Sequence, residues 1–126
     1  MVKRVLVVDD DRAIVGFLKD ELSRKLPELD IIAAESGFQA LTHVLSGGID
    51  LLITDIAMPD LDGYELFSRA REQNSQLPVI MMTGFGYDPN HTIVRAREDG
   101  LRPNDIVFKP FDAEIIIQLI KEHLKE

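Results

Sequence analysis

Four short hydrophobic runs along the chain each end in a polar residue. The runs cover residues 5–8, 51–54, 79–82 and 106–108, and the polar residues that follow them are Asp9, Asp55, Thr83 and Lys109. Apolar runs of this length predict strands that are buried on both faces, as the strands of parallel sheets are. Ligands of an open parallel sheet bind beyond the carboxyl ends of its strands. We therefore expect two carboxylates, a hydroxyl and an ammonium to converge at one edge of a sheet.

Apolar residues at helical spacing separate these runs, and the strand–helix pattern repeats five times. The strands are expected at about residues 4–9, 29–34, 50–55, 78–83 and 105–108. Strict alternation predicts a parallel sheet with right-handed crossovers and helices on both faces. We therefore predict an α/β fold, a flavodoxin-like doubly wound five-stranded parallel sheet in the order 2-1-3-4-5. Its switch point lies between the first and third strands, where Asp9, Asp10 and Asp55 are expected.

Apolar positions on three of the predicted helices indicate their buried faces. Phe17 in the first helix, Phe38 in the second and Ile115 in the last fall at helical spacing with other apolar residues. Ile117 could leave the outer side of the last helix partly apolar as a partner surface, but an ordinary core edge is the favoured interpretation. Asp62 is the predicted N-cap of the third helix.

Composition limits the classes of function. The chain has 126 residues, which suit one domain, and its 14 basic and 22 acidic residues give a net charge of −8. A phosphate backbone requires clustered Lys and Arg, so we expect no direct contact with nucleic acid or with an anionic membrane. The absence of cysteine excludes disulfides and thiolate metal sites. No signal peptide or membrane-spanning run is visible, so we expect a soluble, cytoplasmic protein.

The acidic cluster indicates a metal site. Asp9, Asp10 and Asp55 would repel one another, and a fold can relieve that repulsion by protonating one group or by binding a cation. Oxygen ligands without Cys or a nearby His favour a hard ion, and a site with few protein ligands suits Mg²⁺. The alternative is that Asp9, Asp10 and Asp11 only cap a helix and stabilise its dipole.

Asp55 is the carboxylate that is placed to act as a nucleophile. A carboxylate oxygen can attack phosphorus to form an acyl phosphate, and the transferred group then needs a metal and fixed donors for its oxygens. Thr83 and Lys109 could supply those donors. Taken alone, a strand-end Thr is usually only a strand former, and a Lys before Pro is usually a solvated charge.

At this point the chain resembles the receiver domain of two-component response regulators. The resemblance rests on four segments in order: residues 5–11, residues 55–63, Thr83-Gly84 and Lys109-Pro110-Phe111. It covers essentially the whole chain, so we expect residues 1–126 to form a single receiver domain. Such a domain is a phosphoacceptor signalling switch that takes part in a two-component phosphorelay.

The resemblance implies a role for each residue of the cluster. Asp55 would accept a phosphoryl group from a sensor histidine kinase or a histidine phosphotransfer protein. Asp10 and Asp55 would bind Mg²⁺ directly, together with the main-chain carbonyl of Ala57, and Asp9 would act through water.

It also implies roles for the other two strand ends. Thr83 and Lys109 would hold the phosphoryl oxygens. Pro110 resembles the family's proline that follows a cis peptide bond and directs the lysine inward.

One departure from the family concerns the conformational switch. Members commonly carry an aromatic residue three positions before the lysine, and here that position is Ile106. Thr83 and Ile106 are the switch candidates. Phe108, Phe85 or Tyr87 could take the aromatic role instead.

Two further departures concern loops near the site. The segment between Thr83 and Lys109 is longer than usual by a few residues, and its glycines suggest a mobile loop before a modified fourth helix. The residues two positions beyond Asp55 and Thr83 are Ala57 and Phe85, and neither side chain can orient a hydrolytic water. We therefore predict slow self-dephosphorylation.

The main alternative function is a Mg²⁺-dependent phosphatase or phosphotransferase with an Asp nucleophile, similar to haloacid-dehalogenase enzymes. Those enzymes carry a second Asp two residues after the nucleophile, where this chain has Ala57. A flavin-binding domain is a third possibility, but the acidic first loop would repel a phosphate without a metal. We therefore predict a regulatory domain that assists its own phosphorylation and dephosphorylation and is not a turnover enzyme.

The output of such a switch is expected through partner binding. The surface formed by the fourth helix, fifth strand and fifth helix would contact a downstream protein or an effector domain. The same surface could form a homodimer.

Overall fold

The protein is described by a computed structural model, which covers residues 2–84 and 91–125. The strands are β1 (Arg4–Val8), β2 (Asp30–Ala34), β3 (Leu51–Asp55), β4 (Val79–Thr83) and β5 (Ile106–Phe108). The helices are α1 (Arg12–Lys25), α2 (Gly37–Ser46), α3 (Gly63–Gln73), α4 (Thr92–Glu98) and α5 (Ala113–Leu124), with a 3₁₀ turn, η1 (Pro103–Asp105), before β5. Within the described ranges, none of the helices has both the length and the apolar character that crossing a bilayer requires.

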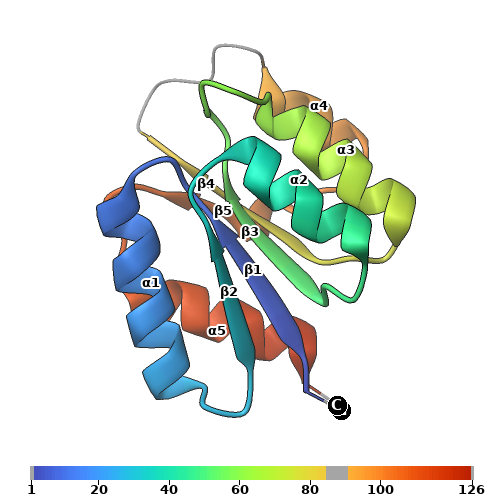
Figure 1. Cartoon of the computed structure of the whole chain (residues 1–126). Helices are drawn as coiled ribbons and strands as arrows, with labels where there is room; N and C mark the ends of the chain where they lie inside the picture. Colours follow the sequence, from blue (N-terminus) through green and yellow to red (C-terminus); the bar gives the residue numbers. More distant parts are fainter. Residues whose placement is uncertain (1, 85–90, 126) are drawn as a thin grey trace.

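The five strands form one parallel sheet in the order β2-β1-β3-β4-β5. This order confirms the predicted flavodoxin-like fold. Helices α1 and α5 lie on one face of the sheet, and α2, α3 and α4 lie on the other (Figure 1). Because β1 and β3 are neighbours whose following helices cover opposite faces, the switch point of the sheet lies between them, where ligands of such folds bind.

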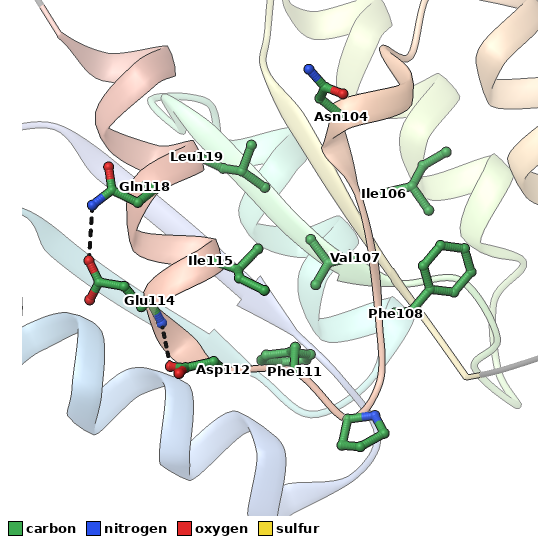
Figure 2. Close-up of a pocket in the computed structure, with 11 residues that line it drawn as sticks. Asn104, Ile106, Val107, Phe108, Phe111, Asp112, Glu114, Ile115, Gln118 and Leu119 are labelled. Carbon is green, nitrogen blue, oxygen red and sulfur yellow. Dashed lines mark hydrogen bonds between the residues drawn. The ribbon is translucent and has the colours of Figure 1, made fainter.

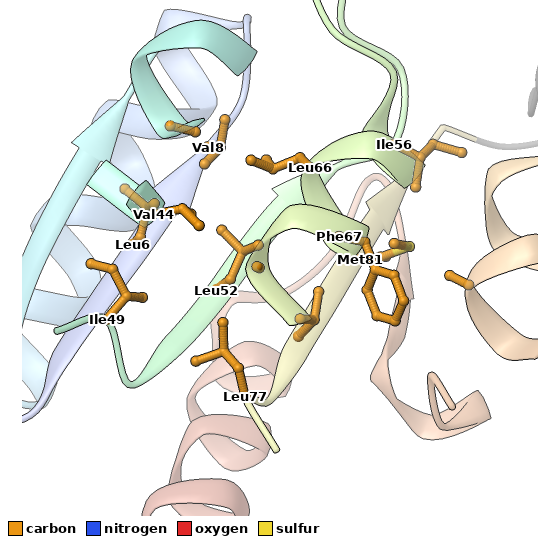
Figure 3. Packing of buried hydrophobic residues seen from close by; sticks show 14 of the residues in the cluster. Leu6, Val8, Val44, Ile49, Leu52, Ile56, Leu66, Phe67, Leu77 and Met81 are labelled. Carbon is orange, nitrogen blue, oxygen red and sulfur yellow. The ribbon is translucent and has the colours of Figure 1, made fainter. Parts of the chain in front are cut away.

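Alternate side chains of each strand enter two separate cores. Leu6 of β1 packs under α2 and α3 together with Leu52, Phe67 and Met81, as Figure 3 shows. The intervening residue Val7 belongs to the second core, under α1 and α5. The central strands are therefore buried on both faces, which explains their uninterrupted apolar sequence.

The ends of the elements differ slightly from the sequence-based bounds. Asp62 caps α3 as predicted, since its side chain accepts a hydrogen bond from the Tyr64 amide. The fifth strand is shorter than predicted, because η1 occupies the residues before Ile106. The β4–α4 connection that was expected to be mobile falls largely at 85–90, outside the described residues.

Three apolar side chains that the sequence pattern placed on the buried faces of helices are exposed. Phe17, Phe38 and Ile115 have exposed fractions of 50%, 58% and 50%. Ile117 is buried at 3% exposure and belongs to the core under α1 and α5, which confirms the favoured interpretation of a core edge over a partner surface. The helix is rotated so that Ile116 and Ile117 face the core and Ile115 faces outward.

Candidate functional site

The carboxyl ends of β1 and β3 bring three carboxylates together. Val8 is paired in register with Thr54, so Asp9 and Asp55 leave the sheet side by side. Carboxylate oxygens of Asp9, Asp10 and Asp55 lie within 4.8 Å of one another. Asp9 is fully buried and Asp55 is 6% exposed, whereas Asp10 is exposed. The expected acidic cluster is therefore present at the switch point of the sheet.

Lys109 and Thr83 lie at the same edge, at the ends of β5 and β4. The Lys109 ammonium donates to Asp9 Oδ2 at 2.7 Å and lies 3.5 Å from Asp55 Oδ1. The Lys109 amide donates to the Thr83 carbonyl at 2.8 Å, and the peptide bond between Lys109 and Pro110 is cis, as expected. The Thr83 hydroxyl is nearly buried and donates to the Gly84 carbonyl at 3.0 Å.

The electrostatics of the cluster follow from burial and from repulsion between carboxylates. Burial, and then the nearby charge of Asp9, raise the pKa of Asp55 to about 6, although Lys109 opposes this shift. Burial and Asp9 also raise the pKa of Asp10. Burial lowers the pKa of Lys109, but its hydrogen bond to Asp9 and the charge of Asp55 outweigh burial, so the pKa is raised. One ammonium therefore faces three acidic groups, and a further cation would stabilise all three.

The donor set fits a small hard cation. Three carboxylates from two adjacent loops supply only oxygen atoms, and the partial exposure of the cluster through Asp10 leaves room for water ligands. This combination suits Mg²⁺, which keeps several waters and prefers oxygen. Ala57, whose main-chain carbonyl was the fourth expected ligand, lies in the loop that follows Asp55 and is paired with Asp62 in an antiparallel bridge.

One residue that shapes this loop was missed from the sequence. Both carboxylate oxygens of Asp60 accept main-chain hydrogen bonds from the start of α2, from Gly37 at 3.1 Å and from Phe38 at 2.9 Å. Burial raises the pKa of Asp60, but these amide donors outweigh it and lower the pKa. The partners lie more than twenty positions apart, so no local signal in the sequence indicates the contact.

The two switch candidates lie on the last two strands: Thr83 ends β4, and Ile106 begins β5. Ile106 is half-buried and packs against the core that contains Met81 and Ala96. Phe108, a proposed substitute for the missing aromatic residue, lies on the same side of β5 as Ile106 but is 56% exposed (Figure 2). Phe85 and Tyr87 lie outside the described residues.

Comparison with known proteins decides the family. A family model of the response regulator receiver domain matches residues 5–121. The chain belongs to this family. As a receiver domain, it is a phosphoacceptor switch of two-component systems, and the alternative of a phosphatase is not favoured. Receiver domains usually bind Mg²⁺ at an acidic cluster, are phosphorylated by sensor kinases and link to effector domains.

The relatives of this receiver domain are larger proteins. It is 33% identical over 123 residues to the response regulator protein FleR of Pseudomonas aeruginosa, a match that covers 98% of this chain and 25% of FleR. It is 36% identical over 124 residues to the sensor protein EvgS of Escherichia coli K12, a match that covers 97% of this chain and 9% of EvgS. The chain thus spans a quarter or less of these two relatives.

A solved structure agrees in fold over nearly the whole receiver domain. The CheY-like response regulator receiver domain protein of Methanospirillum hungatei superposes with a TM-score of 0.84 at 28% identity. The match covers 97% of this chain and 93% of the other. Both the sequence family and the three-dimensional structure therefore assign the chain to a regulatory role.

Proposed function

We propose that Asp55 is the phosphoacceptor of this receiver domain. A carboxylate oxygen of Asp55 attacks the phosphorus of a phosphohistidine, a new P–O bond forms, and the P–N bond breaks. The electron pair of that bond returns to the imidazole nitrogen of the donor, which takes up a proton. The observation that carries the proposal is the position of Lys109, whose ammonium lies 3.5 Å from Asp55 and can pair with the incoming phosphoryl oxygens.

The neighbouring residues prepare Asp55 for this reaction. Asp9, Asp10, Asp55 and the main-chain carbonyl of Ala57 would hold Mg²⁺, with Asp9 acting through water. When bound, the ion neutralises charge on the phosphoryl oxygens and lowers the pKa of Asp55, so that the nucleophile is ionised. Asp9 also holds the Lys109 ammonium at 2.7 Å, which fixes the cation beside the acceptor before any phosphoryl group arrives.

Thr83 would respond to the new group. Its hydroxyl donates to the Gly84 carbonyl in the unmodified protein. A phosphoryl oxygen on Asp55 would compete for that hydrogen, and rotation of the hydroxyl would release the start of the β4–α4 connection. Thr83 and Ile106 would together bias the surface made by α4, β5 and α5.

The output surface contains an apolar groove between β5 and α5. Val107 of β5 faces Ile115 and Leu119 of α5 across this groove, and Phe108 lies at its other side (Figure 2). Ile115 and Phe108 are both at least half exposed. A downstream protein, an effector domain or a second copy of the chain would bind here, and phosphorylation of Asp55 would change the affinity.

The proposal includes slow loss of the phosphoryl group rather than turnover. Ala57 stands where a phosphatase of the haloacid-dehalogenase type has its acid–base Asp, so no carboxylate in that position can activate water. The domain would be phosphorylated by a sensor histidine kinase or a histidine phosphotransfer protein and would remain modified long enough to bind its partner.

Intact mass spectrometry with a small phosphodonor tests the proposal. Wild type and Asp55→Asn are incubated with phosphoramidate and Mg²⁺, and then with hydroxylamine. We expect wild type to gain the mass of one phosphoryl group, to lose it in hydroxylamine, and to gain none when EDTA replaces Mg²⁺. Labelling of the Asp55→Asn variant would overturn the assignment, and continuous release of phosphate would favour the enzyme.

A further inference from the structure

The loop between β3 and α3, residues 56–62, is folded back on itself beside the acidic cluster. Ala57 and Asp62, at its two ends, are paired in an antiparallel bridge. Gly63 follows the loop and lies so close to Ile56 that an added Cβ would be 2.5 Å from the Ile56 carbonyl oxygen. Because the two ends are in contact, a displacement of Asp62 is transmitted to Ala57.

Asp62 connects this loop to α4. Its Oδ2 accepts a hydrogen bond from Arg95 Nη2 at 2.8 Å. Its Oδ1 accepts from the Tyr64 amide at 2.8 Å and from the Thr92 hydroxyl at 3.3 Å. Burial raises the pKa of Asp62, but the bonds from Arg95 and Tyr64 outweigh it and lower the pKa. Asp62 is therefore ionised at neutral pH and can hold both α3 and α4.

Arg95 is fixed on its other side by an aromatic ring. Its guanidinium carbon lies 4.4 Å from the centre of the Tyr64 ring, and the Tyr64 hydroxyl donates to Asp99 at the end of α4. Stacking and a directed pair with a carboxylate are both properties of the planar guanidinium. The side chains of Arg95 and Asp62 are only 39% and 32% exposed, so their attraction is less screened than that of a fully exposed pair.

We propose that Arg95 is a positioning residue of the phosphoryl-transfer site, because through Asp62 it fixes the loop that carries Ala57. This inference rests on the proposed function, in which the Ala57 carbonyl is a metal ligand. The pair joins the acceptor loop to α4 by a route that does not use the side chain at position 106. Because coupling between two sites is reciprocal, the position of α4 changes the affinity for Mg²⁺, and Mg²⁺ in turn stabilises α4 against the loop.

Titration of the unphosphorylated full chain with Mg²⁺, followed by isothermal calorimetry, tests the inference. We expect Arg95→Gln to weaken Mg²⁺ binding about threefold to fivefold, at the low end of typical coupling between sites. The direction of the change in Mg²⁺ affinity is decisive. Coulomb's law alone predicts that removing a positive charge near a cation site tightens binding, so weaker binding reports a change in position rather than in charge.

A second variant separates the ion pair from the helix cap. Asn caps helices about as well as Asp, so Asp62→Asn keeps the α3 cap and removes only the charge. We expect Asp62→Asn also to weaken Mg²⁺ binding, and the double variant to bind no more weakly than the weaker single variant. Additive losses would overturn the inference, because they would mean that the two residues act separately.

The matched control is Arg69→Gln. Arg69 pairs with Glu65 on the surface of α3 at 3.2 Å, with exposed fractions of 41% and 48%, and its replacement makes the same change of charge away from the loop. We expect the Mg²⁺ affinity of this variant to equal that of wild type or to be slightly tighter. Amide hydrogen exchange of residues 56–62 should accelerate in Arg95→Gln and stay unchanged in Arg69→Gln.

Three further results would overturn the inference. If the Arg95→Gln variant binds Mg²⁺ as tightly as wild type and wild type is labelled at Asp55, the positioning role is rejected and the proposed function stands. A wild-type chain that neither binds Mg²⁺ nor is labelled would reject both. If Arg95→Gln melts below the assay temperature, Arg95→Lys takes its place, because lysine keeps the charge and lacks the planar guanidinium. About twofold weaker Mg²⁺ binding by Arg95→Lys supports the inference, and unchanged Mg²⁺ binding rejects it.

Discussion

Two buried carboxylates of this protein have opposite surroundings. Asp55 and Asp105 are 6% and 3% exposed. Asp105, in η1, accepts hydrogen bonds from Arg102 at 3.1 and 3.3 Å, and its Oδ1 lies 2.8 Å from His123 Nε2 of α5. Asp55 accepts a bond from the Ile56 amide at 3.0 Å but shares its only nearby ammonium in the described chain with Asp9.

The difference separates a structural carboxylate from the proposed phosphoacceptor. The hydrogen bond with Asp105 raises the pKa of Arg102, and the contact between Asp105 and His123 ties η1 to α5. Burial and Asp9 instead raise the pKa of Asp55 to about 6, so its charge is costly until a cation arrives. Burial alone therefore does not mark a functional carboxylate, but an excess of negative charge around it does.

The largest expected effect on stability comes from replacing the structural carboxylate, Asp105. Asp105→Asn loses charge-assisted hydrogen bonds to Arg102 and His123, which contribute about 1.5–3 kcal/mol in buried positions. We expect the free energy of unfolding in urea to fall by about that amount, whereas labelling of Asp55 by phosphoramidate continues. An unchanged urea midpoint would show that the Asp105 contacts contribute nothing net.

Replacement of the proposed phosphoacceptor, Asp55, should change the free energy of unfolding in the opposite direction. Asp55 has a pKa of about 6 in the folded chain against an ordinary 3.8, so the folded state binds more protons between these values. The contribution of Asp55 to the stability of the wild type in EDTA should therefore fall as pH rises from about 4 to about 7. We expect Asp55→Asn to remove this slope and to stabilise the chain by about 1–2 kcal/mol at pH 7, after allowance for partial solvation.

Urea unfolding at several pH values in EDTA checks the direction of this pH dependence. A gain from Asp55→Asn that is the same at pH 4 and pH 7 would contradict the electrostatic explanation. Added Mg²⁺ should narrow the difference between the two proteins at pH 7, because it binds the folded wild type preferentially.

The smallest effect concerns the surroundings of Asp55 rather than the carboxylate itself. Ala57 has no polar group with which to orient a hydrolytic water, whereas an amide side chain could do so. We expect Ala57→Asn to shorten the lifetime of the phosphorylated chain about threefold to fivefold, measured by mass spectrometry after removal of the phosphodonor. Ala57→Val is the control, since it adds bulk without a polar group. Equal lifetimes of the Ala57→Asn variant and the wild type would contradict the hypothesis.

The sheet and the convergence at its edge could be predicted from the sequence because they depend on short-range patterns. Apolar runs specify strands, and parallel strands place whatever follows them at a common edge. Which residues of α5 face the core could not be predicted in the same way. Ile115, Ile116 and Ile117 are consecutive, and only the neighbouring sheet decides which two of them are buried.

Contacts between side chains that are far apart in the sequence could not be predicted either. The pair of Asp62 with Arg95 spans 33 positions, and Asp60 reaches α2 across more than twenty, so neither leaves a local pattern. Their geometry depends on the path of the 56–62 loop, which Gly63 allows by its close approach to Ile56. The sequence indicated which residues gather at the candidate site, but the contacts that hold them in place required the fold.

The ion pair between Lys109 and Asp9 has a consequence for biosynthesis. Its partners are separated by 100 positions, and the ammonium comes from the last strand of the sheet. Until β5 has been synthesised and has paired with β4, the Lys109 ammonium cannot reach Asp9. Charge compensation of this buried carboxylate therefore cannot precede the addition of the last strand to the sheet.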